Sequence, residues 1–335
     1  MIIPTLRILR NSQYQKIINV YKKSGIHSLR VNMTRHSLSE YIQHIWFFQN
    51  EIPHLKIFCD IPVPGEKIRL ALPLDSEFHI EENNTYIFTS KKGEGEFKEN
   101  PFAIPVGIDS FPNMQMSEII IGDGEAIFRI TNSNAHFIEA VAAGNSIVRG
   151  HRSIIIPHAL EFRSAQKNQL EEYIEAFKEI KPYAIILSFS EAVSVVQEID
   201  KTISSALGYH PVIIPKIETP SGVNSLEKIT AFYPNVLIGR GDLALTDDIG
   251  RYYNNYRKAL SFHNPPKVNL IVATDILSSL YENTIPSRAD LTDLMVLKEC
   301  GIKDVVASAG ISIDPDLFAL FYQYSSYLKE NSINE

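Results

Sequence analysis

The stretch PVIIPKIETPSGVNSLEKITAFYPNVLIGRGDLAL, from Pro211 to Leu245, carries the pattern that decides the fold. Its first seven residues, Pro211–Ile217, are almost all apolar and predict a buried strand. Ser221–Phe232 then shows helical periodicity, and Asn235–Ile238 is a second short apolar run. Two apolar strands joined by one helix are typical of a parallel sheet that is covered by helices.

The same alternation runs along most of the chain. Helical periodicity fills the segments between the apolar runs, including one long segment from Asp275 to Cys300 that we expect to be helical. The strand candidates are Ile2–Leu9, His27–Met33, Leu55–Ile61, Tyr183–Phe189, Pro211–Ile217, Asn235–Ile238, Val268–Ala273 and Asp304–Ser308. Eight such strands predict the α/β class and, within it, a (β/α)8 TIM barrel.

One region interrupts this alternation. From about Leu70 to Ile155 the helical periodicity disappears, and short alternating strands are separated by turns rich in Gly and Asn. Ile119–Ile130 is predicted to form a hairpin within it. We therefore expect a small β-barrel-like domain, residues 71–155, inserted after strand 3 as a lid, with residues 1–70 and 156–335 forming the catalytic barrel.

Composition excludes several classes of protein. The 335 residues carry a formal net charge of −7, with 32 Lys and Arg against 39 Asp and Glu, which argues against a nucleic-acid binder. Only Cys59 and Cys300 are present, so we expect reduced, buried thiols and a cytoplasmic protein. Apolar runs such as Tyr183–Phe189 are too short to span a membrane, and the N-terminus has no signal-peptide cleavage pattern.

Polar residues gather where the predicted strands end, and the C-terminal ends of barrel strands face the active site. Glu218 and Asp242, from neighbouring strands, can share a hard divalent cation such as Mg²⁺ or Mn²⁺. Lys216 lies two residues before Glu218 and so points to the same side of its strand, which suits an anionic substrate. The full set of candidates at this end is Arg30, Asn32, Thr34, Asp60, Ser188, Lys216, Glu218, Arg240, Asp242 and Thr274.

Structural roles compete with these functional ones. Lys216 and Glu218 can form an ion pair that only fills the barrel, and Asp242 can be no more than a helix N-cap. Asp60 can be the structural partner of Arg30. Ser188 and Thr274 can serve as local hydrogen-bond formers, while His36, His151 and His210 have no zinc-like spacing and are interpreted as ordinary polar or core residues.

At these residues the chain resembles the pyruvate kinase family. Ile213–Ile229 and Ile238–Leu245 are similar to the family patterns I-I-x-K-I-E-N-x-E-G-V and V-A-R-G-D-L-G. Further matches, in chain order, are Ser28–His36 with A-R-L-N-F-S-H-G, Cys59–Arg69 with L-D-T-K-G-P-E-I-R, Ile119–Ile130 with I-L-I-D-D-G, and Ala273–Leu294 with A-T-Q-M-L-E-S-M and P-T-R-A-E-V-S-D-V.

The resemblance implies a phosphotransferase that acts between phosphoenolpyruvate and a nucleotide, ADP or ATP, with Mg²⁺ or Mn²⁺. It implies that Lys216 and Arg30 contact the transferred phosphoryl group, that Thr274 lies near the proton-delivery path, and that Glu218 and Asp242 hold the metal. The remaining implied roles are substrate binding by Gly241, Asp242, Arg30 and Ser188, nucleotide binding by Arg69, Arg152 and Asn32, and a monovalent-cation site at Asn32, Thr34 and Asp60. Lys67 stands where many members have Glu, and a Lys there goes with members that need no K⁺.

The departures from the family leave other functions open. Arg7–Ser12 (RILRNS) replaces the first-strand motif T-I-G-P-A-S, Ser308–Ser312 replaces S-G-E-T-A, and Asp275 replaces a Gln. The family's C-terminal regulatory domain is expected to be absent, and a homo-oligomer is compatible with the sequence. The alternatives are a Mg²⁺-dependent lyase or aldolase that acts through a pyruvate enolate, and a non-catalytic paralogue that binds a keto acid.

Overall fold

A computed structural model describes residues 1–8, 14–34, 36–64, 68–73, 76–111, 118–122, 124–150, 152–155, 164–245, 249–264 and 267–329. The chain forms two compact units, Met1–Gly65 with Phe162–Glu335, and Glu66–Glu161. No described helix has the length and apolar character needed to cross a membrane.

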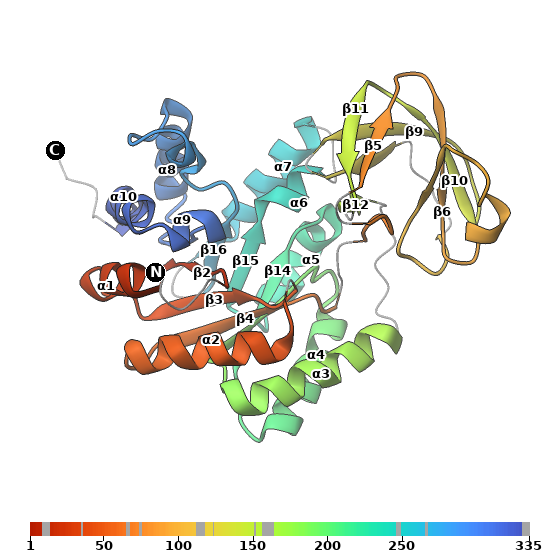
Figure 1. Ribbon diagram of the computed structural model, residues 1–335. Coiled ribbons are helices and arrows are strands. Elements are labelled where there is room, and N and C mark those ends of the chain that lie inside the picture. The colour runs from red at the N-terminus through yellow and green to blue at the C-terminus, as the bar shows by residue number, and fades with distance from the viewer. Residues whose placement is uncertain are drawn as a thin grey trace. The chain divides into compact units, whose positions relative to one another are not determined.

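A closed parallel sheet forms the centre of the first unit (Figure 1). Its strand order is β1-β17-β16-β15-β14-β13-β4-β3-β2, and β1 and β2 together make the first barrel strand. The strands are β1 (Ile2–Ile3), β2 (Thr5–Leu6), β3 (Ser28–Asn32), β4 (Lys56–Ile61), β13 (Ala184–Leu187), β14 (Val212–Ile217), β15 (Asn235–Gly239), β16 (Asn269–Ala273) and β17 (Asp304–Val306).

Pro4 divides the predicted strand Ile2–Leu9 into two short pieces. β1 pairs with β17 on one side, and β2 pairs with β3 on the other, so the change of partner at Pro4 closes the barrel. Proline has no N–H to donate, but its carbonyl oxygen still accepts from the Arg30 N–H at 2.8 Å. The predicted strand was therefore too long, and its last residue, Leu9, lies outside the described residues.

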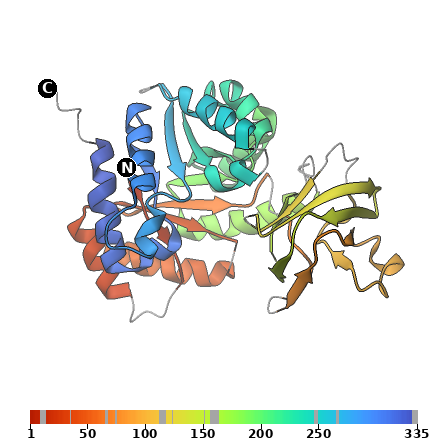
Figure 2. The same ribbon diagram turned by 90° about the horizontal axis from the view of Figure 1, so that it is seen from above.

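Helices surround these strands, as the view from above shows (Figure 2). The predicted helix from Asp275 to Cys300 is wrong in its first half, which contains only the short 3₁₀ helix η3. The helices are α1 (Tyr14–Lys23), α2 (Leu38–Glu51), α3 (Ser164–Ile180), α4 (Val193–Leu207), α5 (Pro220–Thr230), α6 (Arg240–Leu245), α7 (Ile249–Ser261), η3 (Ser278–Tyr281), α8 (Arg288–Glu299), α9 (Ala309–Ile313), α10 (Pro315–Ser326) and η4 (Tyr327–Lys329).

The second unit follows β4, the third barrel strand, and contains sheet that is antiparallel except for one parallel pair of strands, β6 with β7. A six-stranded sheet has the order β12-β8-β9-β10-β6-β7, and β5 pairs separately with β11. The predicted hairpin at Ile119–Ile130 is observed as β8 paired with β9. The elements are β5 (Glu77–Ile80), β6 (Thr85–Thr89), η2 (Glu94–Glu96), β7 (Ala103–Pro105), β8 (Glu118–Ile121), β9 (Ala126–Ser133), β10 (Phe137–Ala142), β11 (Ser146–Arg149) and β12 (Ile154–Ile155).

The predicted fold class is confirmed: an α/β barrel carries a β domain inserted after its third strand. Most barrel strands are apolar on both faces, because one face packs against the helices and the other fills the barrel, whereas β2 and β3 contribute no residue to the apolar interior. The barrel interior is formed by Ile3, Phe58, Ala184, Ile186, Ile214, Leu237, Ile271, Ala273 and Val306. Both cysteines are free, Cys59 buried and Cys300 half-buried.

Candidate active site

Strand alternation directs the candidate side chains toward the inside of the barrel. Phe58 and Ile214 belong to the apolar interior, and Asp60 and Lys216 follow them by two residues on the same strands. Because side chains alternate along a strand, Asp60 and Lys216 lie on that interior face, one step closer to the C-terminal ends. Arg30 lies between Leu29 and Val31, which pack toward the helices, so it also points inward.

Asp60 is the centre of an ion-pair cluster at this end of the barrel. Arg30 donates to Asp60 Oδ2 from Nη2 at 2.6 Å and from Nε at 2.9 Å, and the Ser188 hydroxyl donates to Asp60 Oδ1 at 3.0 Å. Lys216 Nζ lies 2.8 Å from Glu218 Oε1 and 3.7 Å from Asp60 Oδ2. Asp60 is therefore the partner of Arg30, which is the structural alternative that the sequence allowed.

Burial and charge act in opposite directions on these groups. Burial alone would raise the pKa of the Asp60 carboxyl, but the charges of Lys216 and Arg30 outweigh it and hold that pKa below 3.8. Burial would likewise lower the pKa of Lys216, but Asp60 and Glu218 raise it above 10.5. Lys216 is thus a permanent cation, held in place before any substrate arrives.

Glu218 and Asp242 form the second pair of interest. Both are buried, with 2% and 8% of their surface exposed. Burial and the neighbouring charge of Asp242 raise the pKa of Glu218, although Lys216 opposes that shift. A cation bound between two buried, neighbouring carboxylates reduces the repulsion between their charges.

The backbone supports that arrangement. Glu218 Oε2 accepts a hydrogen bond from the Phe189 N–H at 3.2 Å, and Phe189 has a positive φ of 53°. Asp242 lies in the first turn of α6, which begins directly after β15. In the described part of the chain no group of three or more His, Cys, Asp or Glu side chains forms a metal site, so these two carboxylates stand as a pair. Their oxygen donors suit Mg²⁺, which keeps several water or substrate ligands.

Thr274 lies at the end of β16 in an unusual backbone conformation. Its φ is +79°, a strained value for a β-branched residue, and Asp275 follows with +52°. A Cβ atom at Gly241 would lie 2.9 Å from Thr274 Cγ2, so only glycine fits at position 241 without a shift of Thr274. Gly241 and Thr274 are thus in tight contact.

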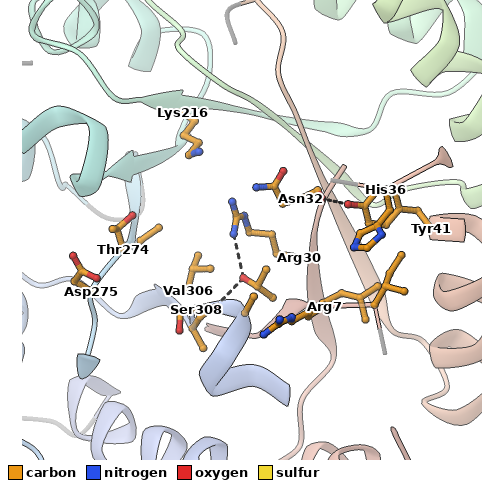
Figure 3. A pocket seen from close by; sticks show the side chains of 16 residues that line it. Arg7, Arg30, Asn32, His36, Tyr41, Lys216, Thr274, Asp275, Val306 and Ser308 are labelled. Carbon is orange, nitrogen blue, oxygen red and sulfur yellow. Dashed lines mark hydrogen bonds between the residues drawn. The ribbon is translucent and has the colours of Figure 1, made fainter. Parts of the chain in front are cut away.

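A cavity of about 230 Å³ opens in the first unit beside these groups (Figure 3). It brings residues from the first two barrel strands and Lys216 of β14 together with residues at and after the ends of β16 and β17. The lining residues are Thr5, Leu6, Arg7, Ile8, Arg30, Asn32, His36, Tyr41, Lys216, Ala273, Thr274, Asp275, Val306, Ala307, Ser308 and Ala309.

Four of the predicted site residues, Arg30, Asn32, Lys216 and Thr274, line this cavity. Asn32 also accepts a hydrogen bond from the exposed Thr34 hydroxyl at 2.8 Å. The other predicted site residues of this unit do not line the cavity; they are Thr34, Asp60, Ser188, Glu218, Gly241 and Asp242.

The predicted nucleotide-binding residues Arg69 and Arg152 belong to the second unit. Arg152 Nη2 forms an ion pair with Glu125 Oε1 at 2.6 Å, and Arg69 makes an isolated β-bridge with Ser153. Lys67, predicted at the monovalent-cation site, lies outside the described residues, as does His151.

Several lining residues were not predicted from the sequence. His36 was interpreted as an ordinary polar residue, but it lines the cavity, with its ring 5.7 Å from that of Tyr41. Arg7 and Ser308 also line the wall, and the Ser308 hydroxyl is hydrogen-bonded to that of Tyr281 at 2.6 Å. Arg7 and Ser308 could have been predicted from the sequence, because they directly follow the first and the eighth strand.

Comparison with known proteins gives a consistent result. A family profile described as pyruvate kinase, barrel domain, matches residues 2–306. Pyruvate kinase of Pyrobaculum aerophilum is 24% identical over 89% of this chain and 63% of its own length. The pyruvate kinases of Thermococcus litoralis and Methanocaldococcus jannaschii are 25% and 26% identical, over 84% and 88% of this chain and 59% and 60% of their own lengths. The chain thus spans about three-fifths of the length of these relatives.

Proposed function

Because this chain belongs to the pyruvate kinase family, we propose that it is a phosphotransferase that moves a phosphoryl group between phosphoenolpyruvate, or a close analogue, and a nucleotide. The observation that carries the proposal is the fixed ammonium group of Lys216, 2.8 Å from Glu218 and on the wall of the cavity. Phosphoryl transfer needs positioned cations around the moving group and no covalent nucleophile, and these residues supply that chemistry.

Each residue has a role that follows from its place. Lys216 and Arg30 face the cavity and stabilise negative charge on the phosphoryl oxygens. Asp60 orients both cations, because its Oδ2 forms ion pairs with Arg30 Nη2 at 2.6 Å and with Lys216 Nζ at 3.7 Å. Thr274 lies on the same wall, where its hydroxyl can hold a proton near the enolate carbon.

Mg²⁺, or Mn²⁺ in its place, is the proposed metal, held by Glu218 and Asp242. Bound there, it would neutralise charge on substrate oxygens. The fit rests on two buried carboxylates close enough for Asp242 to raise the pKa of Glu218. The backbone at Gly241 and Asp242 is proposed to receive the substrate carboxylate, and Ser188 acts indirectly, through its hydrogen bond to Asp60.

The proposed monovalent-cation site comprises Asn32, Thr34 and Asp60. Asn32 and Thr34 are already in contact at 2.8 Å, and Asp60 lies next to Asn32 across the β3–β4 pair. Arg69 and Arg152 remain proposed contacts of the nucleotide phosphates, with Asn32 on the cavity wall. The rate of the reaction, measured with added K⁺ and compared with the rate in the same concentration of Na⁺, tests whether this site binds a monovalent cation.

Calorimetric titration with oxalate and Mg²⁺, followed by ADP and ATP, tests the function. We expect oxalate, a mimic of the pyruvate enolate, to bind only with the metal, and we expect pyruvate to form from phosphoenolpyruvate and ADP. In Glu218→Gln the Mg²⁺-dependent binding of oxalate should be lost. Oxalate binding without nucleotide binding or turnover would refute the kinase function and favour a lyase or a keto-acid-binding protein, and absence of both would refute all three.

A further inference from the structure

The cavity in the barrel carries an excess of positive charge. Three permanent cations, Arg7, Arg30 and Lys216, line it, together with one carboxylate, that of Asp275. Such a concave surface of one sign attracts ligands of the opposite sign. The three cations differ in whether a carboxylate partner balances their charge.

Two of the cations are paired with buried carboxylates. Arg30 is paired with Asp60 at 2.6 Å, and Lys216 is paired with Glu218 at 2.8 Å. Neither carboxylate lines the cavity, so both pairs present their cationic members to the cavity and keep their anionic members buried. These two cations are the ones that the proposed phosphoryl transfer uses.

Arg7 is different, because no hydrogen bond or ion pair joins its guanidinium to any of the residues that the structure describes. It follows β2 directly, and its backbone carbonyl accepts a hydrogen bond at 3.3 Å from Tyr14, a residue only 1% exposed. The backbone of Arg7 is therefore anchored to the core while its side chain is exposed. Figure 3 shows its guanidinium end directed to the same space as Arg30 and Ser308.

We propose that Arg7 forms a second anion subsite in this cavity, which binds a phosphate group of the second substrate. A guanidinium without a carboxylate partner offers its fork of N–H donors to the oxygens of a phosphate, the geometry that arginine binds best. His36 and Asn32 line the same cavity and can donate further hydrogen bonds. The second substrate then has two contacts with positive charge, at Arg30 with Lys216 and at Arg7.

The identification of this ligand as the second substrate rests on the proposed function, but the phosphate-binding role of Arg7 is tested separately. The probes are AMP, adenosine and pyrophosphate, titrated calorimetrically without added metal into the wild-type protein and into Arg7→Gln, Arg7→Lys and Arg288→Gln. Arg288 is the matched control, because it is an exposed arginine of the same unit, on α8, and does not line the cavity.

We expect AMP and pyrophosphate to bind the wild-type protein and adenosine to bind at least tenfold more weakly. Arg7→Gln should weaken both phosphate-bearing probes by about tenfold or more, Arg7→Lys should restore part of that loss, and Arg288→Gln should change neither. Tighter binding of AMP than of pyrophosphate identifies a nucleotide as the source of the phosphate, and the reverse order identifies a phosphorylated small molecule without a base.

Equal affinity of wild type and Arg7→Gln for the phosphate-bearing probes overturns the inference, as does an absence of binding to wild type or an equal loss in Arg288→Gln. Titration of the same variants with oxalate and Mg²⁺ separates this failure from that of the proposed function. If oxalate binds but Arg7 makes no difference, only the subsite is refuted. If oxalate does not bind to the wild-type protein or to any variant while phosphate binding depends on Arg7, only the proposed function is refuted.

Discussion

Arg240 holds the carbonyl oxygen of Thr274 with two hydrogen bonds, from Nη2 at 2.8 Å and from Nε at 3.0 Å. Its remaining nitrogen, Nη1, donates to Asp293 Oδ1 at 2.6 Å. Arg240 thus bridges the end of β16 to α8, and only 9% of its surface is exposed. Thr274 has a φ of +79°, so this clamp holds a strained residue in place on the cavity wall.

Replacing Arg240 with Lys should lower kcat about tenfold or more. The ammonium group cannot reproduce the planar fork, and loss of a charged hydrogen bond costs about 1.5–3 kcal/mol. Asp293→Asn should give a smaller decrease, because it leaves both bonds to Thr274 intact. The measurement is kcat and KM for phosphoenolpyruvate, with Arg257→Lys, an exposed arginine of α7, as control. An unchanged kcat in Arg240→Lys, with only the melting temperature lowered, would show a purely structural role.

Lys216→Met should reduce the rate of phosphoryl transfer by about 10² or more, because it removes a preorganised cation from the cavity wall. The substitution leaves Glu218 and Asp60 without that partner, so the protein should also melt at a lower temperature. Rates are therefore measured well below the melting temperature, and Mg²⁺ binding is measured in parallel. Retention of the full rate would contradict the role of Lys216 in the reaction.

The positions of the inner site residues could be predicted because they depend on strand alternation alone. Lys216 follows Ile214, and Asp60 follows Phe58, on strands that are apolar on both faces. Any parallel barrel directs such residues to the mouth of its interior. The ion pair between Lys216 and Glu218 follows from the same period of two.

The segment after β16 could not be predicted, because tertiary contacts determine its backbone. Its composition indicates a helix, yet Thr274, Asp275 and Leu277 all have positive φ, which no α-helix allows. The hydrogen bonds from Arg240 that stabilise this conformation come from a residue 34 positions away. Similarly, Arg7 reaches the cavity only because β1 and β2 close the barrel, a feature that no local pattern reports.

The stability of the protein should depend on the protonation of His263. Burial lowers the pKa of His263 below 6.5, although the Gly301 carbonyl and Asp304 oppose that shift and Lys303 adds to it. Its Nδ1 accepts a hydrogen bond from the Leu270 N–H at 3.3 Å, which requires the neutral ring. The unfolded chain therefore binds more protons below about pH 6.5, and the stabilising contribution is lost as the pH falls through the folded-state pKa.

Urea unfolding between pH 5 and 8 checks this prediction. The free energy of unfolding should fall toward the acidic end in the wild-type protein and fall less steeply in His263→Asn. His210→Asn, at an exposed position, is the control and should follow the wild type. Identical slopes for wild type and His263→Asn would be inconsistent with a half-buried, neutral His263.

Gly239→Ala should weaken Mg²⁺ binding about tenfold without removing any metal-binding atom. A Cβ atom at this last residue of β15 would lie 2.8 Å from Glu218 Cγ and 3.0 Å from its Oε1. The carboxylate has little freedom to move away, because Oε1 is paired with Lys216 and Oε2 accepts from the Phe189 N–H. The added methyl group therefore displaces Glu218 relative to Asp242 or strains the backbone, and such overpacking costs about 1–3 kcal/mol.

Calorimetry with Mg²⁺ and oxalate measures this loss, and melting temperatures separate it from unfolding. Gly144→Ala is the control, because a Cβ atom there would meet nothing within 4 Å. A Gly239→Ala protein that binds Mg²⁺ with wild-type affinity would mean that the carboxylate of Glu218 does not hold the ion. Loss of metal affinity in this variant and in Glu218→Gln, but not in Gly144→Ala, ties the metal to the position of one carboxylate rather than to the charge of the cavity as a whole.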